Sequence, residues 1–110
     1  MVVLDTGVVL DRVRRKQGIS ENVTVVSVVE WPPLLRYAGF EGKVYYPVLE
    51  DFRAAYETQE RLYSSGKMKG FADLLIAAIC MNRNERLVTM DSDFRDIAGA
   101  SDLEVEIIEV

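Results

Sequence analysis

Short apolar runs alternate with helical patterns along this sequence, and this alternation is the feature that most constrains its fold. Apolar and β-branched residues dominate 2–4, 22–26, 86–90 and 103–110, as is typical of β-strands. A further short extended segment is expected at 43–48. Apolar strands separated by helices form parallel sheets that helices cover on both faces. We therefore expect an α/β fold, a three-layer α/β/α sandwich around a mainly parallel sheet of four to five strands.

Five helices are expected between and after these strands, at 6–16, 27–38, 49–65, 71–83 and 91–99. In the helix at 49–65, apolar residues with helical spacing predict the face that packs into the core: Leu49, Phe52, Tyr56 and Tyr63. The segment 71–83 is apolar nearly all round, so it should be the most buried helix. In the helix at 27–38, Pro32 and Pro33 are tolerable only within its first turn or two.

The chain of 110 residues has the length of one domain, and no repeat or linker divides 1–110. No apolar run approaches the roughly 18 residues of a membrane-spanning helix, so no membrane association is expected. An acid at position 5 and the lack of a basic leader argue against a signal peptide. A single cysteine, Cys80, excludes an internal disulfide. These features predict a cytoplasmic protein.

The sequence contains no histidine, which removes several classes of chemistry. Ser-His-Asp and Cys-His catalysis, ribonuclease chemistry with a histidine pair and histidine-containing zinc sites are excluded. Acid–base or metal chemistry must then rest on carboxylates, whose oxygens suit Mg²⁺ or Mn²⁺. The net charge is −5, yet basic residues cluster at 11–16, 66–70 and 82–86. An acidic site with basic surroundings is therefore compatible with the composition.

Two acids directly follow apolar strands. Asp5 follows 2–4, and Asp91 follows the strand that begins at 86. The carboxyl ends of parallel strands share one edge of a sheet, where α/β proteins bind ligands. Glu30 and Asp73 lie near the starts of expected helices, so their side chains can reach the same edge. Each acid also has a structural interpretation as a helix cap or as an acid in a first helical turn, and Ser27 with Glu30 matches a capping box.

Asp73 is the only charged residue between Phe71 and Asn82, in the helix expected to be most buried. A buried carboxylate needs a partner. The only basic residue one helical turn away is Lys69, which precedes the helix. A cation shared by Asp73 and the other acids would satisfy all of them at once.

Four segments of the sequence resemble, in order, the four acidic motifs of the PIN domain, most closely those of the VapC toxins of toxin–antitoxin pairs. They read VVLDTGVVLD, SVVEW, GFADLLIAAIC and LVTMDSDF. The resemblance implies that Asp5, Glu30, Asp73 and Asp91 form a metal-binding and catalytic quartet. It also implies that a fifth acid, Asp93, joins them as a metal ligand. It also implies an α/β/α sandwich, Mg²⁺- or Mn²⁺-dependent cleavage of RNA, a homodimer, and a VapB-like antitoxin that inserts a segment at the active site.

The sequence departs from the family pattern in two places. Family members usually have a longer helical arm between the first two strands, where this chain has only about six residues, QGISEN. After Glu30, Trp31-Pro32-Pro33 replaces a regular helix. Both regions help to form the RNA groove, the dimer face and the antitoxin contact in the family.

A carboxylate-bound ion favours hydrolysis of RNA by an attacking water, which leaves 5′-phosphate and 3′-hydroxyl ends. Thr6, Thr89 and Ser92 are candidates to orient the water on the metal from a second shell, with packing or capping as the alternative for each. Five basic residues are candidates to contact RNA phosphates, with a solvated surface as the alternative: Arg12, Arg14, Arg15, Lys67 and Lys69.

Two other interpretations remain at this stage. The stronger one is a non-catalytic PIN-like binding or scaffold module, since the shortened arm can cost the protein its substrate groove. The weaker one is a phosphoacceptor receiver domain, which has a similar size and layering. A receiver domain needs an adjacent acid pair after the first strand and a lysine at the last strand, whereas Thr6 follows Asp5 and 103–110 contains no lysine.

Overall fold

The structure is a computed structural model that describes residues 1–109. Its strands are β1 (Val2–Leu4), β2 (Val23–Thr24), β3 (Val44–Tyr45), β4 (Arg86–Thr89) and β5 (Val105–Ile107). Its helices are α1 (Thr6–Arg14), α2 (Val25–Glu30), the 3-10 helix η1 (Pro32–Arg36), α3 (Leu49–Ser64), α4 (Phe71–Asn82) and α5 (Phe94–Gly99). No helix in this part of the chain has the length and apolar character that crossing a bilayer requires.

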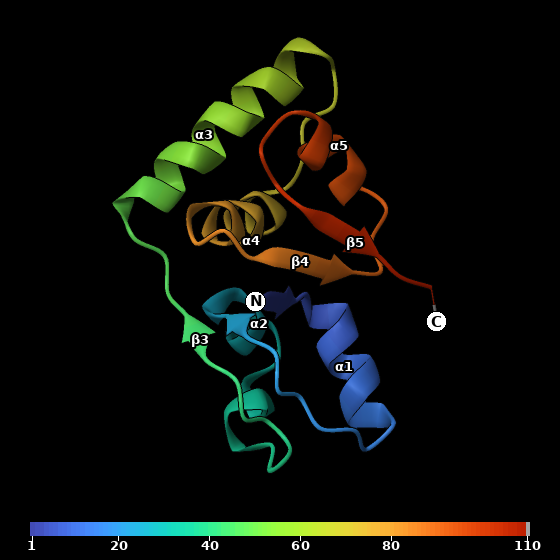
Figure 1. Ribbon diagram of the computed structural model, residues 1–110. Coiled ribbons are helices and arrows are strands. Elements are labelled where there is room, and N and C mark those ends of the chain that lie inside the picture. The colour runs from blue at the N-terminus through green and yellow to red at the C-terminus, as the bar shows by residue number, and fades with distance from the viewer. Residues whose placement is uncertain (110) are drawn as a thin grey trace.

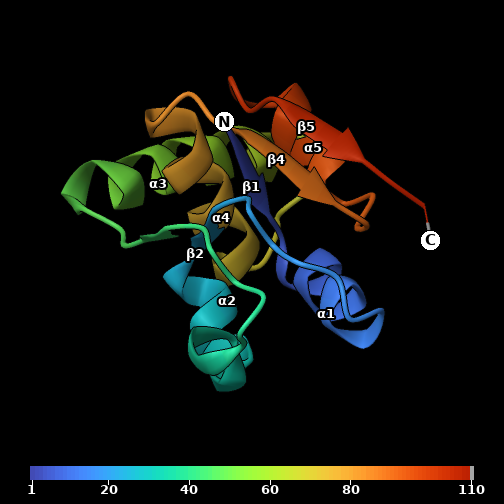
Figure 2. The same ribbon diagram turned by 60° about the horizontal axis from the view of Figure 1, so that its bottom comes forward.

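The main sheet has three parallel strands in the order β1-β4-β5, with Val3 beside Leu87 and Leu87 beside Val105. The strands β2 and β3 form a separate parallel pair. A bridge between Val3 and Asn22 joins this pair to the free edge of β1, which Figure 2 shows between the two parts. The prediction of one sheet with four to five strands is therefore wrong in its count, because β2 and β3 pair over only two residues and contact β1 through one.

Helices cover both faces of the main sheet, so the predicted three-layer α/β/α architecture is confirmed (Figure 1). Alternate strand residues face opposite layers, as the pleat requires. Val3 and Leu87 pack against α3, α4 and α5 on one face. Leu4 and Val88 pack against α1 and the segments around β2 on the other. Each layer therefore has its own apolar core.

The helix α4 lies at the centre of the first of these cores, as its sequence predicted. Every residue from Leu74 to Cys80 is buried, including the free thiol of Cys80. Burial raises the pKa of this thiol far above its usual value. Asp73 stands just before this buried run, in the first turn of the helix.

The predicted single helix over 27–38 is wrong. The structure has α2 from Val25 to Glu30, then Trp31 with non-helical backbone, then the 3-10 helix η1. Proline lacks an N–H and restricts the residue before it, so Pro32 ends α2 and begins a new turn. At the other end, α2 starts two residues earlier than expected, and Ser27 lies inside it rather than at its cap. The capping-box interpretation of Ser27 is therefore wrong as well.

The predicted buried face of α3 is also wrong. The residues that face the core are Asp51, Ala55, Thr58 and Leu62, whereas the four predicted apolar residues are exposed: Leu49, Phe52, Tyr56 and Tyr63. The carboxylate of Asp51 decides this rotation, because it accepts hydrogen bonds from Asn82 at 2.8 Å and Arg83 at 3.1 Å. Burial raises the pKa of Asp51, but the Arg83 guanidinium and its other hydrogen bonds hold it below the usual value.

Candidate active site

Asp5 joins the first strand to the first helix at the carboxyl edge of the sheet. One of its carboxylate oxygens accepts a hydrogen bond from the backbone N–H of Thr6 at 2.9 Å and caps α1. The other accepts a hydrogen bond from the hydroxyl of Thr89 at 2.7 Å. Burial raises the pKa of Asp5, these two hydrogen bonds oppose that effect, and the nearby charges of Glu30 and Asp91 add to it. Asp5 therefore caps a helix and lies within a field of other acids.

Glu30 reaches the same region from the end of α2. Its carboxylate accepts a hydrogen bond from the Thr6 hydroxyl, whose oxygen also lies 2.7 Å from the hydroxyl oxygen of Ser27. Ser27 is buried inside α2, one helical turn before Glu30. Sequence reasoning missed Ser27 as a site residue by interpreting it as a cap. The spacing of three residues, which places both side chains on one face of a helix, was the available signal.

Asp91 follows β4 and is connected to Asp5 through one side chain. The buried hydroxyl of Thr89 donates to Asp5, and its oxygen accepts the backbone N–H of Asp91 at 3.0 Å. The carboxylate of Asp91 in turn accepts the backbone N–H of Asp93 at 2.9 Å, so it also stabilises the turn before α5. Asp93 is exposed and lies 3.8 Å from the Lys69 ammonium. Ser92 is exposed, and among residues 1–109 its hydroxyl makes no hydrogen bond to these acids.

Asp73 enters from the first turn of α4, and its pKa is raised to about 6. Burial is the largest cause. The other causes are the negative charges of four carboxylates: Asp5, Asp91, Glu30 and Asp93. No basic side chain in the described part of the chain forms an ion pair with Asp73, and Lys69 instead pairs with Asp96 at 2.9 Å. The charges that most shift the pKa of Asp73 are therefore all negative.

The donor set of this cluster has the chemistry that a hard divalent cation requires, since every charged ligand would be a carboxylate oxygen. In residues 1–109 no three carboxylate or thiol side chains are close enough together to hold an ion as they stand. Two carboxylates about 5 Å apart repel each other by about 3 kcal/mol at an effective dielectric of about 20, so a cation between them would be stabilising. The chemical type of these side chains therefore fits a divalent ion.

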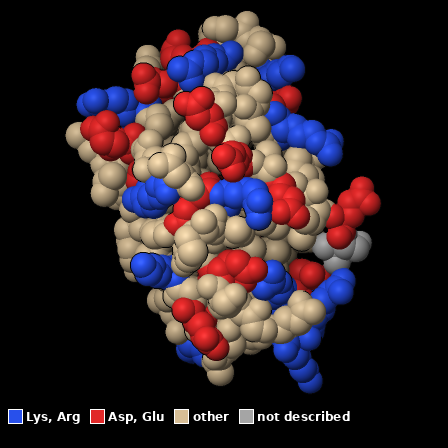
Figure 3. Space-filling model, in the orientation of Figure 1, with Lys and Arg blue, Asp and Glu red and all other residues tan. Residues whose placement is uncertain are grey.

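The five basic residues considered for phosphate contacts are placed unevenly. Arg12 is committed to a bidentate pair with Glu21, with distances of 3.0 and 2.7 Å. Arg14 and Arg15 extend from the end of α1, are largely exposed and share Asp11. The other two, Lys67 and Lys69, both pair with Asp96 beside the acid cluster. Figure 3 shows acidic and basic side chains interspersed over one face of the molecule, so no single-sign surface dominates that face.

A cavity of about 590 Å³ lies away from the acids, among α3, the end of α4 and the segment after α5. Its lining includes Glu85 and Glu104, which directly precede β4 and β5. It therefore opens at the amino ends of the strands, whereas Asp5 and Asp91 follow the carboxyl ends. The candidate site therefore lies outside this cavity, at the other end of the strands.

The sequence matches the profile of the PIN domain family over residues 40–100, which is more than half of the chain. This protein belongs to the PIN domain family. The matched segment includes Asp73 and Asp91 and excludes Asp5 and Glu30, which the fold brings to the same edge. No curated protein matches the sequence.

Solved structures with the same fold cover almost the whole chain. A chain of VapBC2 from Rickettsia felis, bound to a DNA fragment from their promoter, aligns with 99% of this PIN domain and 100% of its own length, at 16% identity and a TM-score of 0.75. A chain of VapBC-1 from nontypeable Haemophilus influenzae aligns with 97% of this chain and 98% of its own length, at 17% identity and a TM-score of 0.75. A chain of VapBC-5 from Mycobacterium tuberculosis aligns with 96% of this chain and 97% of its own length, at 21% identity and a TM-score of 0.71. At these identities the likeness establishes the fold.

Proposed function

We propose that this PIN domain is a divalent-metal-dependent endoribonuclease and the toxin of a VapBC-type toxin–antitoxin pair. The observation that carries the proposal is the convergence of acids from four separate parts of the chain at one edge of the sheet. Burial and then the fields of the other acids raise the pKa of Asp73 to about 6, and no basic side chain in residues 1–109 forms an ion pair with it. A metal ion resolves this arrangement, and cleavage of a phosphodiester bond is the chemistry that such an ion serves.

Asp5, Glu30, Asp73 and Asp91 would hold the ion, with Asp93 at its margin. A bound Mg²⁺ or Mn²⁺ lowers the pKa of a water molecule and neutralises charge on the reacting phosphate. The protein's own part is to position the carboxylates. Thr6 holds Glu30 through its hydroxyl and Asp5 through its backbone N–H.

Thr89 extends this positioning to the fourth strand. Its hydroxyl donates to Asp5, and its oxygen accepts the backbone N–H of Asp91. Hydrogen bonds of this kind fix the orientation of ligands before the metal arrives. Ser92, which lies exposed beside Asp91, remains a candidate to orient water.

RNA is the proposed substrate, with water as the nucleophile. The chain has no imidazole to activate a 2′-hydroxyl, so the products should carry 5′-phosphate and 3′-hydroxyl ends. Lys67 and Lys69 are proposed contacts to phosphates because both pair with Asp96 and Lys69 also approaches Asp93. Arg14 and Arg15 are proposed because their side chains are largely exposed at the end of α1. We assign Arg12 a smaller part, since Glu21 already occupies its guanidinium.

A VapB-like antitoxin and a second copy of the chain are the proposed protein partners, and the cytoplasm is the proposed location. The solved structures that share the fold over nearly the whole chain are described as toxin–antitoxin complexes, which supports the antitoxin. The homodimer is supported by large apolar side chains that are exposed on α3.

A non-catalytic PIN-like binding module is the second candidate. It is favoured by one observation, that no three acids in residues 1–109 are gathered closely enough to hold an ion as they stand. Cleavage of RNA separates the two functions.

The test is the cleavage of a mixed RNA by the purified protein with Mn²⁺, with EDTA as the metal-free control. Asp73→Asn should reduce the rate at least 100-fold, because it removes one of the proposed ligands. Asp102→Asn is the matched control, since Asp102 is an exposed acid beyond α5 and should retain the parent's rate. The products should accept ligation through a 5′-phosphate. Equal rates for the Asp73→Asn protein and the parent would show that the site is assigned wrongly, and no cleavage by the parent would favour the binding module.

A further inference from the structure

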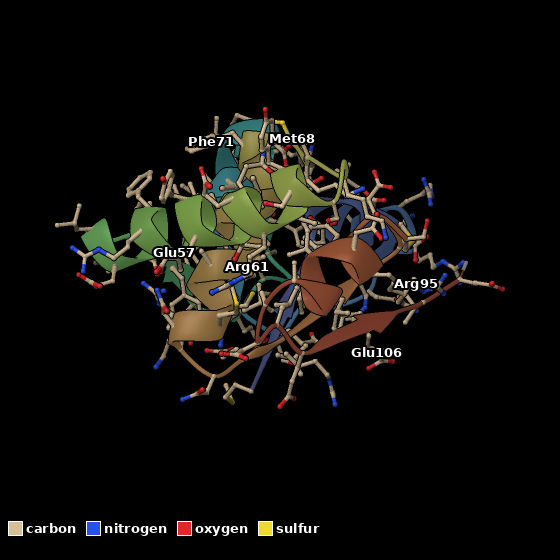
Figure 4. All side chains as sticks on the ribbon, turned by 90° about the horizontal axis from the view of Figure 1, so that it is seen from above. Glu57, Arg61, Met68, Phe71, Arg95 and Glu106 are labelled. Atoms are coloured by element: carbon tan, nitrogen blue, oxygen red, sulfur yellow. The ribbon has the colours of Figure 1, made fainter. Side chains whose placement is uncertain are left out.

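The cavity at the amino ends of the strands is lined by glutamates from three separate segments of the chain. Glu57 lies on α3, Glu85 directly before β4 and Glu104 directly before β5. Figure 4 shows Glu57 and Arg61 on the side of α3 that faces α4 and α5. The volume of about 590 Å³ falls among those of sites that bind small molecules, which are about 300–1,000 Å³. The cavity therefore has the size of a ligand site.

Glu85 is the most buried of these glutamates, with 6% of its surface exposed. Its carboxylate accepts hydrogen bonds from the amide of Asn22 at 3.0 Å and from the hydroxyl of Tyr45, and both donors are neutral. The arginines nearest to it in the sequence, Arg83 and Arg86, pair with other carboxylates at 3.1 and 3.6 Å. Within residues 1–109 this buried negative charge therefore has hydrogen bonds but no cation, and a cation that reached it would be stabilising.

The hydroxyl of Thr58 is a second group in the cavity wall that lacks a partner. Thr58 follows Glu57 on α3, is 2% exposed and lines the cavity. Its hydroxyl makes no hydrogen bond within residues 1–109. In the same range, the one unpartnered side-chain oxygen that is sealed from solvent belongs to Thr24, so the Thr58 hydroxyl opens onto the cavity. Buried hydroxyl groups are normally hydrogen-bonded, and a ligand in the cavity would supply the missing bond.

The basic side chain in the cavity wall does not neutralise the glutamates. The guanidinium of Arg61 donates a hydrogen bond to the backbone oxygen of Ala100 at 3.1 Å. Neither Glu57 nor Glu104 forms an ion pair in the part of the chain that the structure describes, and both side chains are exposed at the opening. The cavity therefore offers one negative charge in its wall and two at its opening to a positively charged ligand.

The size and the lining of the cavity favour a flexible molecule over a single ion. A water-sized ion would fill only about 30 Å³ of it. Because the glutamates come from three separate segments, a ligand with several positive charges along its length can pair with more than one of them. Ala54, Met81 and Gly99 contribute apolar lining that suits methylene groups between those charges.

We propose that this cavity binds a linear polyamine, a chain of methylene groups that carries two or more ammonium groups. One ammonium group pairs with Glu85 in the cavity wall, and another reaches Glu57 or Glu104 at the opening. Each ammonium group has three N–H donors, so donors remain for the Thr58 hydroxyl. This site lies at the opposite end of the strands from Asp5 and Asp91, and the inference does not rest on the proposed ribonuclease function.

Isothermal titration calorimetry of the metal-free full chain with spermidine, at pH 7.5 and low salt, tests the proposal. One spermidine per chain should bind with a Kd of about 0.1–1 mM, and added salt should weaken the binding. An unbranched diol of similar length carries no charge and should not bind. Failure of spermidine to bind at concentrations up to about 10 mM would overturn the proposal.

Substitutions in the cavity wall test the assignment of the site. Glu57→Gln and Glu85→Gln should each weaken spermidine binding at least about fivefold. Glu60→Gln is the matched control, because Glu60 is an exposed acid on the same helix that lies outside the cavity lining. Thr58→Val should weaken binding about twofold and leave the free energy of unfolding unchanged, since the lost hydroxyl has no partner in the chain. Glu57 is exposed, so its variant should fold even if Glu85→Gln does not.

The pattern of losses separates the cavity from other sources of binding. Equal losses in Glu57→Gln and Glu60→Gln would indicate a general attraction of polycations to a chain of net charge −5 and would refute the site. Loss of binding in Asp73→Asn together with parent-like binding in Glu85→Gln would place spermidine at the candidate active site instead. Tighter binding of trilysine than of spermidine would assign the cavity to a basic protein segment and reject the polyamine. None of these results bears on cleavage of RNA.

Discussion

Replacing Asp73 with asparagine should stabilise the metal-free protein at neutral pH. The pKa of Asp73 is raised from 3.8 to about 6, first by burial and then by the other acids of the cluster. A difference of about two pH units corresponds to about 3 kcal/mol of unfavourable interaction in the charged form. The side chain keeps part of its contact with water, so we expect about 1–2 kcal/mol to be realised. Asparagine keeps the shape of the side chain and removes the charge.

The pH dependence of this gain follows from the sign of the shift. The folded protein binds the Asp73 proton more tightly than the unfolded chain does, so this group favours folding most below about pH 4. That contribution is lost as the pH rises through about 6. The gain from Asp73→Asn should therefore be small at pH 4, grow between pH 4 and 6, and be complete above pH 7.

Urea unfolding in EDTA at pH 4 and pH 7.5 measures the free energies of unfolding of the parent and of Asp73→Asn. Thermal melts at pH 7.5 should show that Asp73→Asn raises the Tm by about 4–12 °C. Asp102→Asn, in an exposed acid outside the cluster, is the control and should change little. Adding Mn²⁺ should raise the Tm of the parent more than that of Asp73→Asn, since ligand binding stabilises the folded state. A less stable Asp73→Asn protein at pH 7.5 in EDTA, or a gain that does not shrink at pH 4, would refute the reasoning.

Two further predictions follow from contacts in the structure. Ser27→Ala removes the buried hydroxyl that contacts Thr6, so it should lower the free energy of unfolding by about 1 kcal/mol and slow RNA cleavage about tenfold, as urea unfolding and single-turnover assays would show. Gly42→Ala should cost at least 2 kcal/mol in urea unfolding, because its added carbon would lie 1.9 Å from a backbone oxygen of Glu21. Gly99→Ala is its control, since no atom lies within 4 Å of the added carbon, and it should be neutral or slightly stabilising.

The sequence alone determined the elements whose signals are local. The runs at 2–4 and 86–90 are apolar on both faces, which parallel strands under two helical layers require, and β1 and β4 formed there. The segment 71–83 is apolar all round and became the buried α4. Because parallel strands end at one edge, the positions of Asp5 and Asp91 after two such strands were enough to predict that they lie near each other.

Tertiary structure decided which way the helices turn and where they end. A helical repeat in the sequence reports that one face is apolar, but it does not report what the rest of the chain offers that face. In α3 the face that contains Asp51 is buried, and the face with the aromatic residues is exposed. Asp51 can be buried because Arg83 and Asn82, more than thirty residues away, donate hydrogen bonds to its carboxylate. The role of Ser27 likewise depends on Thr6, twenty-one residues earlier. Partners so distant in sequence meet only in the folded chain, where the cost of burying an unpaired charge or hydroxyl outweighs local pattern.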